Sequence, residues 1–121
     1  MNALIEFLRA RLDDDERTAR EAGSRSVNWS VNGTWHLEGV EHDVVGEEEA
    51  FCHPHNVEHI ARHDPARVLR EVDAKRRILE LYDVSTSREL KLDAWELMKH
   101  AVRALALPYA DHPDYDESWR P

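Results

Sequence analysis

Apolar residues recur at steps of three and four through the middle of the chain, between positions 55 and 82. This spacing places them along one side of an α-helix and predicts a central helix with a single buried face. The residues that follow the pattern are Ile60, Ala61, Val68, Leu69, Val72, Leu79 and Tyr82. Asp64 and Pro65 interrupt it, because proline lacks a backbone N–H and aspartate favours the position just before a helix. We therefore expect a bent central helix over residues 55–82, with a short arm ending near His63 and a long arm from Pro65 to about Tyr82.

Two further segments, residues 1–22 and 88–107, carry the same helical spacing. The apolar face of the first consists of Leu4, Ile5, Leu8, Leu12 and Ala19. The apolar face of the second consists of Leu92, Trp95, Met98, Val102 and Leu105. Gly23 and Pro108, which follow these segments, are residues that commonly end helices. Residues 83–87 have the sequence DVSTS, so we expect a loop between the central helix and the last one.

The period changes to two after Gly23, which predicts a β-hairpin region over residues 27–45. Alternating apolar residues are found at Val27, Trp29, Val31, Trp35 and Leu37. Asn32 and Gly33 lie between them and predict a two-residue hairpin turn. With that turn, the two tryptophans of the region would pair across the strands and would either cover the helical core or offer an aromatic platform to a ligand. Residues 41–45 are compatible with a short third strand.

Together these elements predict a mainly helical α+β fold with three principal helices, one β-hairpin and an aromatic C-terminal tail. The tail, residues 108–121, carries three prolines, two tyrosines and Trp119 among acidic residues. Aromatic residues at that density favour a tail that folds back over the domain rather than a free peptide arm. A length of 121 residues suits a single domain over residues 1–121 with one core.

The composition narrows the range of functions. The formal net charge is -9, so the average field repels nucleic acid and anionic membranes, and a nucleic-acid role would require a local basic patch. No apolar run approaches the ~20 residues that a membrane span needs, and the first residues lack the unbroken apolar segment of a signal peptide. Cys52 is the single cysteine, which excludes an intrachain disulfide. We therefore expect a soluble cytoplasmic protein.

The most specific chemical motif is the string CHPHNVEHIARH, which begins at Cys52. In a helix, His55, His59 and His63 lie on one face at four-residue steps, just downstream of the cysteine. Imidazole nitrogen and thiolate sulfur are preferred ligands of zinc, so these four residues form a candidate zinc site. Three histidines in line over two turns do not easily reach one ion. A real site would therefore combine two of them with Cys52, His42 or another distant ligand.

Signals for catalysis are weaker. Glu58 precedes His59, and the resulting H-x-x-E-H order resembles the motif of inverzincin metallopeptidases, but those enzymes are much larger than this chain. Cys52 follows Phe51, and a lone cysteine in such a position more often packs in a core than acts as a nucleophile. With four glycines, neither of the glycine-rich phosphate loops can be written. We assign no catalytic residues and do not expect an enzyme.

Basic residues continue the histidine face along the central helix. Helical steps from His59 and His63 lead to Arg67, Arg70 and Arg77. This Arg/His face is a candidate surface for a partner protein or, alternatively, for an anion or a nucleic acid. A competing interpretation is that its arginines pair with acidic residues of the first helix or of the tail.

Three long strings of the sequence resemble an uncharacterised family of small proteins that is common in actinobacterial genomes and their phages. They are ALIEFLRARLDDDERTARE at the start, EHIARHDPARVLREVDAKRRIL at the centre and LALPYADHPDYDESWRP at the end. The resemblance covers most of the chain and implies a complete single domain in a bacterial or phage cytoplasmic setting. It implies no activity and supplies no functional residues to transfer.

These observations favour a small non-enzymatic interaction or accessory protein, encoded by a bacterium or a phage. Its partner surface would include Arg67, Arg70, Arg77 and Trp119. The first alternative is a metal-binding protein that uses the Cys/His cluster at residues 52–63. The second is a protein that binds an anion or a nucleic acid through the Arg/His face. A small helical core with an incompletely covered apolar stripe often self-associates, so a homodimer is a further expectation.

Overall fold

The computed structural model describes residues 1–31, 37–39, 54–87 and 92–121. The chain forms two compact units. Residues 1–14 and 72–121 form one, which we call the aromatic unit, and residues 15–71 form the other, which we call the corner unit. Two long helices contribute residues to both units.

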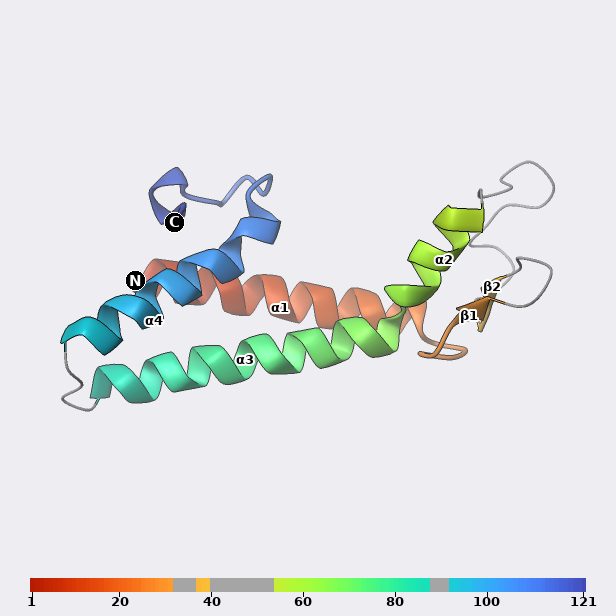
Figure 1. Cartoon of the computed structure of the whole chain (residues 1–121), viewed down its shortest axis with the longest axis horizontal. Coiled ribbons are helices and arrows are strands. Elements are labelled where there is room, and N and C mark those ends of the chain that lie inside the picture. The colour runs from red at the N-terminus through yellow and green to blue at the C-terminus, as the bar shows by residue number, and fades with distance from the viewer. Residues whose placement is uncertain (32–36, 40–53, 88–91) are drawn as a thin grey trace. The chain divides into compact units, whose positions relative to one another are not determined.

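Four α-helices lie in the described part of the chain (Figure 1). They are α1 (Asn2–Ala22), α2 (Pro54–Arg62), α3 (Pro65–Ser87) and α4 (Leu92–Ala106). Two short 3-10 helices follow, η1 (Leu107–Tyr109) and η2 (Glu117–Trp119), and the strands β1 (Ser30–Val31) and β2 (Leu37–Glu38) pair antiparallel. A mainly helical fold with one hairpin is confirmed. The number of helices differs from the expected three because the two arms of the central segment are separate helices.

The core of the aromatic unit is made by one face from each of α1, α3 and α4. Its buried side chains are Leu4, Ile5, Phe7, Leu8 and Leu12 of α1, Val72, Leu79 and Tyr82 of α3, and Val102 and Ala106 of α4. Arg9 pairs with Asp83, whereas Asp13 Oδ1, one turn further along α1, lies 2.6 Å from Arg76 Nη2. Since the partner moves backwards along α3 as α1 advances, the two helices run antiparallel here. The periodicity over residues 1–22 thus predicted the buried face of α1.

Two predicted boundaries needed correction. The expected loop over residues 83–87 is wrong, because α3 continues to Ser87. This segment contains neither glycine nor proline, and its polar residues disfavour a helix only weakly. The last helix, expected over residues 88–107, spans Leu92–Ala106, and residues 88–91 lie outside the described part. Pro108 stands in the first turn of η1, where its missing N–H is not needed.

The C-terminal tail packs against α1 within the aromatic unit. The Phe7 ring lies edge-on to Tyr115, with 6.1 Å between ring centroids, and 5.1 Å from the centroid of Trp119. Arg11 Nη1 donates to His112 Nδ1 at 3.0 Å, and the Arg11 guanidinium also lies over the Phe7 ring. The tail is therefore folded back, as its aromatic content indicated.

Local hydrogen bonds close the end of the tail. Asp116 Oδ1 accepts the backbone N–H of Ser118 at 2.8 Å, and this bond lowers the pKa of Asp116. Glu117 Oε2 accepts from Arg120 Nε at 2.9 Å, which lowers the pKa of Glu117. These hydrogen bonds between residues close in the sequence hold η2 in place.

None of the helices within the described ranges combines the length and the apolar character that crossing a membrane requires.

The hairpin of the corner unit has a register that differs from the expected one. Val31 pairs with Leu37. A two-residue turn at Asn32 and Gly33 would instead have set Val31 opposite Thr34. The predicted turn residues, Asn32 and Gly33, lie outside the described part of the chain. Trp35 and the proposed third strand lie outside the described part of the chain.

Gly39 lies in a place of this hairpin where only glycine fits without strain. Its φ is 94°, a left-handed conformation that glycine adopts without strain. A Cβ atom at Gly39 would lie 2.4 Å from the carbonyl oxygen of Asn28 and 3.0 Å from Cδ1 of Trp29. Gly39, which follows β2, therefore lies directly against the backbone of Asn28 and the ring of Trp29, which precede β1. A shifted register would bring a larger residue into this place.

Candidate functional site

The break between α2 and α3 is built from residues that satisfy backbone groups at the helix ends. Asp64 Oδ1 accepts the N–H of Arg67 at 2.9 Å, and Asp64 Oδ2 accepts the N–H of Trp29 at 3.1 Å. The N–H of Ala66 donates to the carbonyl of Val27 at 2.8 Å. The helix cap predicted from Asp64 and Pro65 is confirmed, and it also fixes residues 27–29 to the first turn of α3.

The C-terminal end of α2 is closed by His63 and Arg67. The His63 N–H donates to the carbonyls of His59 and Ile60, at 3.2 and 3.1 Å. His63 Nδ1 lies 2.8 Å from the same His59 oxygen, so it carries the proton in this contact. Arg67 Nη1 donates to the carbonyl of Arg62 at 3.2 Å. Both side chains therefore stabilise the helix end, where unpaired carbonyls carry partial negative charge.

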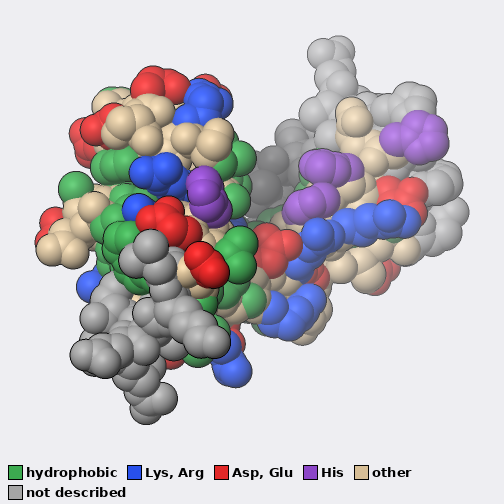
Figure 2. Space-filling model, turned by 60° about the vertical axis from the view of Figure 1, so that its left-hand side comes forward, with side chains coloured by type: hydrophobic (Ala, Val, Ile, Leu, Met, Phe, Trp, Pro, Cys, Tyr) green, Lys and Arg blue, Asp and Glu red, His purple; other side chains and the backbone are tan. Residues whose placement is uncertain are grey.

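Around this break, six polar side chains border one shallow hollow of about 310 Å³. They are His55, Glu58, His59, Arg62, His63 and Arg67, and we call them the histidine corner. All three histidines and both arginines are exposed. Figure 2 shows histidines and basic side chains gathered on this part of the surface. The structure thus brings together the three histidines that the four-residue spacing placed on one face.

The geometry of the corner bears on the candidate zinc site without testing it. The rings of His59 and His63 lie 4.2 Å apart between centroids with a tilt of 35°, so they stack partly on one another. Among the described residues, no group of three or more His, Cys, Asp or Glu is placed to hold a metal ion. Cys52 and His42, the two other proposed ligands, lie outside the described part.

Two arginines of the predicted Arg/His face, Arg67 and Arg77, pair with acids on their own helix, and so does Arg62 of the histidine corner. Arg62 Nη2 lies 3.1 Å from Glu58 Oε1, and Arg67 Nε lies 2.8 Å from Glu71 Oε1. Arg77 has the same arrangement in the aromatic unit, with an Asp73 oxygen 2.9 Å away. Pairing with the acids of α1, the competing interpretation of the sequence, applies to the neighbouring Arg76. Exposed pairs of this kind contribute only about 0.3–0.5 kcal/mol, so a partner's carboxylate can exchange for them.

The residues predicted to form a partner surface fall in different units. Arg67 and the exposed Arg70 belong to the corner unit, whereas Arg77 and Trp119 belong to the aromatic unit. Trp119 packs on Phe7, so its ring contributes to the packing of the tail.

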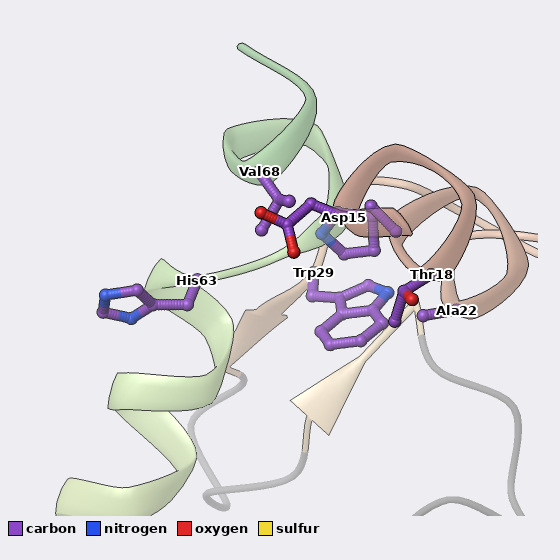
Figure 3. Close-up of a pocket in the computed structure, with 8 residues that line it drawn as sticks. Asp15, Thr18, Ala22, Trp29, His63 and Val68 are labelled. Atoms are coloured by element: carbon purple, nitrogen blue, oxygen red, sulfur yellow. The ribbon is translucent and has the colours of Figure 1, made fainter. Parts of the chain in front are cut away.

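A second hollow, of about 280 Å³, lies beside the histidine corner and is mainly apolar. It is lined by Asp15, Thr18, Ala19, Ala22, Trp29, His63, Pro65 and Val68, and we call it the tryptophan slot. Figure 3 shows the indole of Trp29 across this slot, with the Asp15 carboxylate and the Thr18 hydroxyl near it and the His63 ring directed away. Two hydrogen bonds hold Trp29: its indole Nε1 donates to the carbonyl oxygen of Ser26 at 3.0 Å, and its backbone N–H donates to Asp64 Oδ2.

Sequence reasoning proposed Trp29 as either a core residue or a platform, but it missed the rest of the slot. The walls come from segments far apart in the chain, which no local pattern connects. One signal was available: Thr18, Ala19 and Ala22 are small residues within one turn at the end of α1. Small side chains at a helix end leave space that a neighbouring aromatic ring fills only in part.

Comparison with known proteins places the chain in a family but assigns it no activity. The model described as "Family of unknown function (DUF6221)" matches residues 1–121, so the chain belongs to this family. No curated protein and no solved structure matches the chain.

Proposed function

We propose that this member of a family of unknown function is a non-enzymatic accessory protein that binds an acidic partner protein through the histidine corner. The resemblance carried by the three long strings supports a setting in the cytoplasm of actinobacteria and their phages. The proposal rests mainly on one observation. Five exposed side chains that are cationic or can become so surround a single hollow, in a chain whose formal net charge is -9.

The arginines of the corner have donors to spare for such a partner. A guanidinium has five N–H donors, and Arg62 gives Nη2 to Glu58. Arg67 gives Nε to Glu71 and Nη1 to the backbone of Arg62. The exposed histidines His55 and His59 add N–H donors on the same side. Carboxylates are the groups that such a set recognises best, because guanidinium binds them with two parallel hydrogen bonds.

A labelled hexaglutamate peptide tests this proposal by fluorescence anisotropy. Replacing both Arg62 and Arg67 by glutamine is expected to weaken binding about tenfold, since each exposed charge contact is worth roughly 0.5–1 kcal/mol. Arg77→Gln is the matched control, because it removes the same kind of pair from α3 outside the corner. If the double variant and Arg77→Gln lose the same affinity for the peptide, or if both bind it as tightly as the wild type, the proposed surface is refuted. Circular dichroism checks that the loss of the Arg67 cap leaves the helices intact.

Metal binding by the same histidines is the second candidate, and one contact favours it. Metal-binding histidines usually donate their other ring N–H to a carbonyl or carboxylate. His63 does so through Nδ1 to the His59 carbonyl, which leaves Nε2 as the nitrogen for a metal. His59 and His63 would supply two ligands, and the further ligands would come from residues outside the described part, where Cys52 and His42 lie.

Titration calorimetry with zinc chloride on protein purified without a histidine tag tests the metal site. We expect one ion per chain, a higher melting temperature with zinc and its reversal by a chelator. His59→Gln should abolish binding, whereas His100→Gln on α4 should not. Cys52→Ser then shows whether the cysteine is a ligand. Absence of stoichiometric heat and of any shift in melting temperature would remove this candidate.

A further inference from the structure

Two hollows of different chemistry meet at one residue of the corner unit. His63 borders both the polar histidine corner and the apolar tryptophan slot. A ligand that enters the slot therefore comes close to His63, which the slot shares with the histidine corner. Binding surfaces with an apolar pocket and a polar rim are typical of protein recognition, where a few buried aromatic side chains supply most of the affinity.

The slot has the size and rigidity for a single aromatic side chain. Pockets for drug-sized ligands start at roughly 300 Å³, and the slot holds about 280 Å³. Its floor is held in one orientation, because both N–H groups of Trp29 are hydrogen-bonded. Ala19, Ala22 and Val68 keep the walls apolar. An aromatic ring that enters here can take an offset-stacked or edge-to-face position on the indole.

The polar atoms at the slot select among aromatic residues. Asp15 and Thr18 line it, and their oxygens lie near the indole (Figure 3). A carboxylate accepts several hydrogen bonds, so Asp15 can take one from a ligand in addition to its contact within the protein. Tryptophan and tyrosine carry an N–H or O–H donor at the end of the ring, whereas phenylalanine carries none. The same carboxylate repels an acidic group that enters the slot itself.

We propose that the partner segment is an acidic peptide with a central tryptophan or tyrosine, and this inference rests on the proposed function. The aromatic side chain fills the tryptophan slot and donates to Asp15. The flanking carboxylates lie outside the slot and bind Arg62 and Arg67. Charge complementarity sets this arrangement, since the slot contains the acid Asp15 and the neighbouring corner contains the two arginines.

Four labelled pentapeptides separate the two parts of the idea: Glu-Glu-Trp-Glu-Glu, its alanine and phenylalanine versions at the centre, and Gln-Gln-Trp-Gln-Gln. Anisotropy with the wild-type chain should rank the first peptide tightest. The alanine version is expected to bind about tenfold more weakly, as for loss of an aromatic anchor. Equal binding of the tryptophan and alanine peptides would overturn the inference but leave the acidic partner standing. Equal binding of the two tryptophan peptides, with glutamate or with glutamine, would overturn the proposed function. The binding of an aromatic residue in the slot would then remain.

Variants of the slot provide the structural control. Ala22→Leu fills the slot from its exposed side and should remove the preference for tryptophan over alanine, while Ala10→Leu, at an exposed position of the same helix, should retain it. Asp15→Asn should reduce the ratio of tryptophan to phenylalanine affinity, because an amide oxygen is a weaker acceptor than a carboxylate. If Ala22→Leu and Ala10→Leu behave alike, the aromatic residue binds elsewhere. Competition by single-stranded DNA at equal charge would point to a polyanion rather than a peptide.

Discussion

Replacing Leu8 by alanine is expected to lower the free energy of unfolding by about 2–5 kcal/mol. Leu8 is 1% exposed and lies in the core of the aromatic unit, in the middle of the buried face of α1. The substitution removes buried methyl groups and leaves a cavity that neighbouring helices fill only in part. Urea denaturation followed by circular dichroism and by tryptophan fluorescence measures the effect.

Leu81→Ala is the matched control for this experiment. Leu81 is 61% exposed on α3, so the same chemical change removes little buried surface. Surface substitutions of this kind usually alter stability by no more than about 0.5 kcal/mol, and alanine is at least as good a helix former as leucine. A similar loss of stability in Leu8→Ala and Leu81→Ala would show that the Leu8 side of α1 is not part of the core.

The parts of the fold that the sequence predicted correctly are those governed by local rules. The face of α1 follows from the spacing of Leu4, Leu8 and Leu12, because a helix brings such positions together whatever lies around it. Asp64 and Pro65 define a helix start by their own chemistry, and the cap bond to Arg67 N–H is present. In both places, the preferred local structure and the packing of the chain agree.

The wrong predictions concern places where long-range contacts outweigh weak local preferences. Residues 83–87 are polar enough for a loop, yet they form the last part of α3. Just before them Tyr82 is buried, and Asp83 pairs with Arg9 of α1. In the hairpin, Val31 pairs with Leu37, and Gly39 lies against Asn28 and Trp29, which are far from it in sequence.

The candidate site divides in the same way. The histidine corner could be predicted, because His55, His59 and His63 lie within one helix and its end, where sequence spacing determines which side chains meet. The tryptophan slot could not be predicted, because it requires α1, the strand region and α3 to come together. The link between them is a hydrogen bond from Trp29 to Asp64, residues that are 35 positions apart.

This link gives the last prediction: Asp64→Ala should lower the free energy of unfolding by about 1–3 kcal/mol. The substitution removes the cap on Arg67 N–H and leaves the part-buried N–H of Trp29 without its acceptor. Thermal unfolding measures the loss. The indole N–H resonance of Trp29 should also move, because the ring is positioned through the same backbone.

Asp64→Asn separates the two bonds. Asparagine is as good a helix cap as aspartate, but it has one oxygen where aspartate has two, so it can replace one of the acceptors and not both. Its stability should therefore fall between those of the wild type and Asp64→Ala. Its affinity for the tryptophan peptide should follow the same order, because the floor of the slot depends on the bond to Trp29. Equal stability of the alanine and asparagine variants would mean that the helix cap contributes nothing, and unchanged peptide binding in both would mean that the slot does not depend on Asp64.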